Sequence, residues 1–117
     1  MPVYALYTDP PLGRVGMNEA EAKKAGLAVL VGKRPMTRVA RAVEKGETLG
    51  FLKILVEASS RRILGASLLG VGADEAVHSL IDAIYAKTPY QEFQRRVRIH
   101  PTVSELLPTV MEDLKSQ

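Results

Sequence analysis

The chain has 117 residues, 46% of them hydrophobic and 25% charged, a composition typical of one globular domain. No apolar run approaches the ~20 residues of a membrane span, and the first residues lack a secretory pattern, so we expect a cytoplasmic protein without membrane contact. The absence of cysteine excludes disulfides and thiol chemistry by this chain, and two histidines argue against a structural zinc site.

Basic residues outnumber acidic residues and give a formal net charge of +3. Some of them cluster, as at Lys33–Arg34 and Arg95–Arg96, and a basic cluster can form a surface for nucleic acid. Acidic residues are interspersed, however, and only four Tyr and two Phe could stack on bases. We therefore interpret the charge as solvated surface and do not expect a nucleic-acid partner.

The N-terminal part predicts one strand and one capped helix. β-branched and aromatic residues predict a strand over residues 3–8, and the prolines that follow predict a turn or extended loop that continues to Gly16. Asn18 is a suitable N-cap, and Glu21 stands at the third helical position, as a capping box requires. These two residues predict a short helix over residues 18–25.

The middle of the chain predicts three further strands, over residues 27–32, 49–57 and 62–71. The stretch 33–43 is ambiguous, because Pro35 interrupts it, and we expect a short helix or an irregular crossing there. The last two strands are apolar on both faces over much of their length. Either helices cover both sides of the sheet or one face meets another subunit.

Two amphipathic helices are predicted in the C-terminal part, over residues 74–87 and 103–115, with Pro108 near the start of the second. A further helical turn is expected over residues 90–95. The apolar stripe of the first helix is Ala76, Val77, Leu80, Ile81, Ile84 and Tyr85. Together these elements predict an α+β fold, a two-layer sandwich in which helices pack on a mainly antiparallel sheet of four or five strands.

Two features near the first of these helices carry no functional assignment. Gly70 and Gly72 resemble the start of a dinucleotide-binding turn, but Glu75 occupies the place of the third glycine and would repel a pyrophosphate. We interpret the glycines as a tight strand-to-helix turn. His78 is expected at a partly buried boundary of the helix, where Asp82 could pair with it.

The chemistry-bearing residues concentrate in the stretch Arg98–Glu105. Pro101 restricts the backbone of His100 to extended or turn geometry, and Thr102 and Glu105 have the spacing of a capping box. A His100–Glu105 pair would be a competent general acid/base, because a carboxylate orients and charges an imidazole. The chain offers no nucleophile for the pair to activate, so another component must complete any substrate site.

Several motifs, in this order, resemble the C-terminal interface domain of the FAD-dependent pyridine nucleotide-disulfide oxidoreductases, the family of glutathione reductase and lipoamide dehydrogenase. The motifs are TDPPLGRVG at 8–16, NEAEA at 18–22, GFLK at 50–53, ILGA at 63–66, GVGADE at 70–75 and HPTVSE at 100–105. The resemblance implies that residues 1–117 form a single interface domain that contributes most of a homodimer contact. The FAD- and NAD(P)-binding domains are absent from the sequence and would be supplied in cis or as a separate chain.

The resemblance also implies site residues. His100 would be an acid/base and Glu105 its partner, acting in trans on the redox-active cysteine pair beside the flavin of the other subunit. It further implies a cis bond between His100 and Pro101 and a contact of both residues with the flavin edge. No other cofactor site is implied in this chain, so FAD and NAD(P)H belong to the parent enzyme and the isolated chain is expected to be inactive. Mercuric reductases usually carry a tyrosine in place of His100 and end in paired cysteines, and neither feature is present.

Two alternatives from other functional classes remain open. A free-standing homodimeric binding module without a redox role would need the same self-associating apolar surface. A basic nucleic-acid-binding domain would show steeply salt-dependent binding to DNA or RNA. The main hypothesis is a homodimerisation domain that completes a flavoenzyme site.

Overall fold

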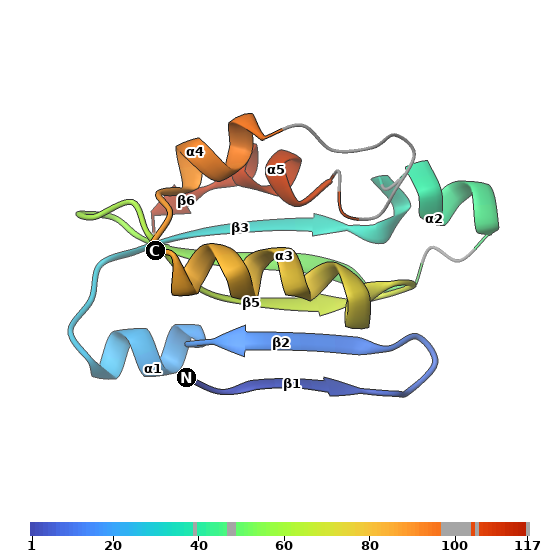
Figure 1. The fold of residues 1–117 in the computed structure, drawn as a ribbon, viewed down its shortest axis with the longest axis horizontal. Coiled ribbons are helices and arrows are strands. Elements are labelled where there is room, and N and C mark those ends of the chain that lie inside the picture. Colours follow the sequence, from blue (N-terminus) through green and yellow to red (C-terminus); the bar gives the residue numbers. More distant parts are fainter. Residues whose placement is uncertain (39, 47–48, 97–103, 105, 117) are drawn as a thin grey trace.

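The computed structural model describes residues 1–38, 40–46, 49–96, 104 and 106–116. It has an α+β fold in which helices pack on one six-stranded antiparallel sheet with the strand order β1-β2-β5-β4-β3-β6 (Figure 1). In chain order the elements are β1 (Val3–Leu6), β2 (Leu12–Gly16), α1 (Glu19–Lys24), β3 (Val29–Pro35), η1 (Met36–Arg38), α2 (Ala40–Lys45), β4 (Phe51–Glu57), β5 (Ile63–Leu69), α3 (Ala73–Tyr85), α4 (Tyr90–Arg95), α5 (Leu106–Val110), η2 (Met111–Asp113) and β6 (Lys115–Ser116).

Helix α1 begins at the predicted capping box. The side chain of Asn18 accepts a hydrogen bond from the backbone N–H of Glu21 at 2.8 Å, and the Glu21 carboxylate accepts one from the backbone N–H of Asn18 at 3.3 Å. Acidic residues occupy the first turn and lysines the last, which complements the helix dipole. This local signal is complete in the sequence, and the helix starts where it was predicted.

The core lies on the face of the sheet that α3 and α5 cover, which we call the helix-covered face. Helix α3 packs on β2 and β5, and α5 packs on β4 and β3. Alternate side chains of the central strands point into this layer, among them Leu52, Ile54 and Leu68, all fully buried. They pack against helix side chains such as Leu80 and Leu107. The apolar residues of the strands, which recur every two residues, and those of the helices, which recur every 3.6, therefore form one core.

Two glycines let helices approach the sheet closely. A Cβ atom built on Gly13 of β2 would lie 2.5 Å from the carbonyl oxygen of Ala73 and 2.9 Å from the Cβ of Val77. A Cβ atom built on Gly32 of β3 would lie 2.6 Å from the carbonyl oxygen of Val110. These positions therefore set how near α3 and α5 lie to the strands.

The opposite face, which we call the open face, is covered in part by α1. A Cβ atom built on Gly65 of β5 would clash with the backbone of Met17, directly before α1, and Leu55 of β4 is buried on this face. Farther along the strands, Tyr4 and Leu6 of β1 are exposed there. The sequence predicted either helices on both faces of the sheet or one face in contact with another subunit. Within the described part of the chain, helices cover one face and part of the other.

The predicted loop through Gly16 is wrong, because residues Leu12–Gly16 form β2. This strand pairs with β1 on one side and β5 on the other, so its backbone groups are hydrogen-bonded within the sheet. The prolines directly before it favoured a loop, and the sequence alone does not show these partners. With β2 and the two-residue β6, the sheet has six strands instead of four or five.

The predicted long last helix is also wrong. Helix α5 spans Leu106–Val110 only, η2 follows, and Lys115–Ser116 then pairs with the edge of β3. Leu107, Val110 and Met111 are nevertheless buried, as the apolar spacing predicts. The spacing thus predicted which side chains are buried. It did not predict the backbone conformation, because the last residues leave the helix and pair with β3.

The remaining predicted elements are present with modest shifts. The ambiguous stretch contains the end of β3 at Pro35, then η1 and α2, and the turn at residues 90–95 is α4. The stripe of α3 is buried at Ala76, Val77 and Leu80, whereas Tyr85 is 71% exposed and does not belong to the core. None of the described helices is long and apolar enough to cross a membrane.

Candidate functional site

The predicted acid/base site falls on residues that the structure does not describe. His100, Pro101 and Glu105 lie outside the described residues, and so does the peptide bond between His100 and Pro101 that was predicted to be cis. The described residues contain a cis bond between Asp9 and Pro10, in the connection between β1 and β2.

The elements on either side of this stretch are anchored in the core. Phe93 of α4 and Leu107 of α5 are fully buried, and the two helices contact one another. Next to α5, Arg34 of β3 donates two hydrogen bonds to the carboxylate of Asp113 in η2, from Nε at 3.0 Å and from Nη2 at 3.2 Å. The chain therefore enters and leaves the stretch that carries His100 from fixed points on the helix-covered face.

The turn before α3 does not fit a dinucleotide. Three of its donors are already used, because the N–H of Ala73 bonds to the carbonyl of Gly70, and the N–H groups of Glu75 and Ala76 bond to the carbonyl of Gly72. Asp74 and Glu75 also place negative charge in the first turn. The structure thus contains the tight strand-to-helix turn that the sequence predicted.

His78 is not the partly buried boundary residue that the sequence predicted, since it is exposed on α3. Among the interactions of the described residues there is no ion pair between His78 and Asp82.

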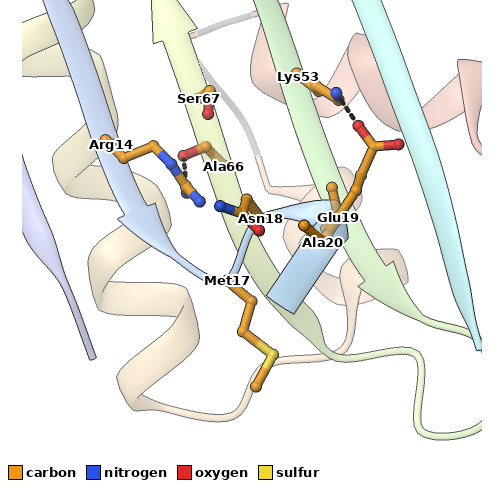
Figure 2. A pocket seen from close by; sticks show the side chains of 9 residues that line it. Arg14, Met17, Asn18, Glu19, Ala20, Lys53, Ala66 and Ser67 are labelled. Carbon is orange, nitrogen blue, oxygen red and sulfur yellow. Dashed lines mark hydrogen bonds and ion pairs between the residues drawn. The ribbon is translucent and has the colours of Figure 1, made fainter. Parts of the chain in front are cut away.

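A polar cavity lies on the open face, at residues to which the sequence pattern assigned no site. Arg14 of β2 is only 9% exposed, and its Nη1 donates hydrogen bonds to the backbone carbonyls of Val15, at 2.6 Å, and Ala66, at 2.8 Å. Figure 2 shows the guanidinium reaching across to Ala66, with the amide of Asn18 beside it. The cavity has a volume of about 200 Å³, and its lining comes from β2, the start of α1, β4 and β5.

Strand register explains why cations gather here. Arg14 pairs with Ser67, Ser67 with Lys53, and Lys53 with Lys33, so that these residues form one row across four strands, the cross-strand row. Lys53 forms an ion pair with Glu19 of α1, and Lys33 lies 4.6 Å from the ring centre of Phe51. Like charges on neighbouring strands destabilise a sheet, and these contacts offset part of that repulsion.

The cavity depends on the pairing of β2 with β5, which the sequence does not display directly. Arg14 alternates with buried Val15 along the strand, and this period of two is the one available signal. The prolines before Arg14 favoured a loop. Because side chains in a loop do not alternate between two faces, the direction of the Arg14 side chain could not be predicted.

Comparison with known proteins identifies the family. The sequence model described as "Pyridine nucleotide-disulphide oxidoreductase, dimerisation domain" matches residues 3–111. A dihydrolipoyl dehydrogenase of Haloferax volcanii is 32% identical over 113 residues, which are 97% of this chain and 24% of that protein. The probable pyridine nucleotide-disulfide oxidoreductase RclA of Escherichia coli is 36% identical over 104 residues, 89% of this chain and 24% of that protein.

Solved structures agree with this relationship. The HOCl-induced flavoprotein disulfide reductase RclA from Escherichia coli superposes with a TM-score of 0.92 and 33% sequence identity, covering 95% of this chain and 26% of that one. LpdA from Mycobacterium tuberculosis, at 19% identity and a TM-score of 0.87, shares the fold. This chain spans about a quarter of the length of the relatives it matches. It belongs to the dimerisation domains of the pyridine nucleotide-disulfide oxidoreductases.

Proposed function

We propose that this chain is the homodimerisation domain of a cytoplasmic, flavin-dependent pyridine nucleotide-disulfide oxidoreductase, and that residues 1–117 form that one domain. The observation that carries the proposal is the family match over residues 3–111, to one quarter of enzymes named dihydrolipoyl dehydrogenase and disulfide reductase. On this proposal His100 and Glu105 act in trans on the redox dithiol of the partner subunit.

Exposed apolar side chains support a role in association. Val3, Tyr4, Leu6 and Tyr7 are between 44% and 84% exposed on and beside β1, which is also an edge strand of the sheet. Exposed large apolar side chains and an open strand edge are features that proteins normally cover. A domain that works beside further subunits and domains accounts for both.

In the proposed mechanism this chain handles a proton. FAD, held by the parent enzyme, would supply electron transfer between NAD(P)H and the dithiol. The His100 imidazole would accept and return the proton of a dithiol sulfur, while Glu105 orients the ring and stabilises its charged form. His100 and Pro101 would contact the flavin edge.

The test is His100→Gln in the complete enzyme that bears this domain. Loss of a positioned general acid/base should lower dithiol–disulfide turnover by about 10²–10⁴-fold while the dimer stays intact. His78→Gln is the matched control, because it removes an exposed histidine on α3 and should leave turnover unchanged. Unchanged turnover in His100→Gln would show that His100 has only a structural role.

A further inference from the structure

The guanidinium of Arg14 is buried without an anionic partner. Its Nη1 bonds to two carbonyl oxygens, but no carboxylate of the described residues lies within ion-pair distance, and Nε and Nη2 have no hydrogen-bond partner there. A buried charge is costly unless an opposite charge and hydrogen bonds satisfy it. The arrangement therefore lacks one acceptor group.

Two further donors line the same cavity. Because the side-chain oxygen of Asn18 is engaged by the backbone N–H of Glu21, its amide nitrogen is the group turned toward Arg14 (Figure 2). The hydroxyl of Ser67, next to Arg14 in register, also makes no hydrogen bond within the described part of the chain. Donors that face one another across a cavity call for an acceptor between them.

Charge and size narrow the chemistry of that acceptor. The lining holds the cations Arg14 and Lys53 and the anion Glu19, which leaves one positive charge uncompensated. The volume of about 200 Å³ exceeds the ~150 Å³ of an engineered cavity that takes up benzene, so a ligand of several non-hydrogen atoms fits. We propose that this cavity is a binding site for a small monocarboxylate, whose oxygens accept hydrogen bonds from Arg14, Asn18 and Ser67.

This site goes beyond the proposed function, because it uses neither His100 nor the dimer. The direct test is a titration of the ¹⁵N-labelled chain with sodium acetate at constant ionic strength, followed by NMR. The side-chain N–H signals of Arg14 and Asn18 should shift and saturate. Inorganic phosphate, a larger and more highly charged anion, should produce weaker shifts at equal concentration. The absence of saturable shifts with acetate, or stronger binding of phosphate, would overturn the proposal.

Two arginine variants separate the site from general charge. Arg14→Met should weaken acetate binding by about tenfold or more, since it removes a charge-assisted hydrogen bond. Arg95→Met removes an equal charge from an exposed position on α4 and should leave the Asn18 shift unchanged. Equal weakening by both variants would mean that acetate responds only to net charge.

Substitutions at Asn18 test the missing acceptor without removing the helix cap. Asn18→Asp should supply a carboxylate to Arg14, abolish acetate binding and raise the melting temperature by about 2–5 °C. Asn18→Ser keeps a capping oxygen without charge and should give no rise. Because an acidic cap also favours the helix dipole, the gain must be clearly smaller in the Arg14→Met background, where only the dipole contribution remains. An equal gain in both backgrounds, or retained acetate binding in Asn18→Asp, would contradict the site.

Discussion

At the scale of single residues, the Arg34–Asp113 ion pair ties the C-terminal part of the chain to the sheet. The Arg34 side chain is 12% exposed and that of Asp113 is 35% exposed, so solvent screens the pair only in part. Asp113→Asn should lower the free energy of unfolding by about 1 kcal/mol, measured by urea denaturation. Glu112→Gln, at an exposed neighbour, is the control and should change it little. Equal losses would mean that the pair adds no specific stability.

Among the candidate site residues, His100 and Glu105 could be identified from the sequence, whereas Arg14 could not. The predicted role of His100 and Glu105 rests on a motif whose parts are adjacent in the sequence, so the sequence alone was enough to nominate the pair. Arg14 is different, because its burial depends on Ala66 and Ser67, about 50 residues away, across a strand pair. Nothing local marks an arginine that bonds to the carbonyl group of a strand so distant in the sequence.

At the scale of elements, the approach of α3 to β2 depends on Gly13. Gly13→Ala would press a methyl group against the carbonyl of Ala73 and the side chain of Val77, and should cost about 2–3 kcal/mol of stability. Gly26→Ala is the comparison: its φ is +75° but no atom lies within 4 Å of the added Cβ, so it carries only a backbone cost of about 1 kcal/mol. Thermal or urea unfolding ranks the two variants. A smaller loss at Gly13 would show that α3 can move away freely.

Elements were predictable where their signals were local. The capping box of α1 and the apolar strands β4 and β5 have their causes within a few residues, and each formed close to its predicted position. The predictions of a loop at β2 and of a long helix at α5 were wrong, because the backbone conformation of these segments depends on partners far away in the sequence. Those partners are the ladders to β1 and β5 and the pairing of the last residues with β3.

At the scale of the whole molecule, the two faces of the sheet have different characters. The helix-covered face holds the hydrophobic core, whereas the open face carries the cross-strand row and the exposed side chains of Tyr4 and Leu6 of β1. A standard protein interface removes about 800 Å² from each partner, roughly an eighth of this chain's 6462 Å² of accessible surface. The exposed apolar side chains are numerous enough to contribute to such an area, which is consistent with a domain that requires neighbours.

Self-association of the isolated chain is the prediction that bears most directly on the proposed function. Sedimentation equilibrium over a range of concentrations should give a mass of twice 12.8 kDa. Association through apolar surface should persist at high salt, because salt screens charges but does not weaken apolar contacts, whereas association through the cross-strand row should weaken. A folded monomer at every concentration would contradict an autonomous homodimer and transfer the contact to the remainder of the parent enzyme. A salt-resistant dimer would establish that the contact resides in this domain, so that His100→Gln could be interpreted within a defined dimer.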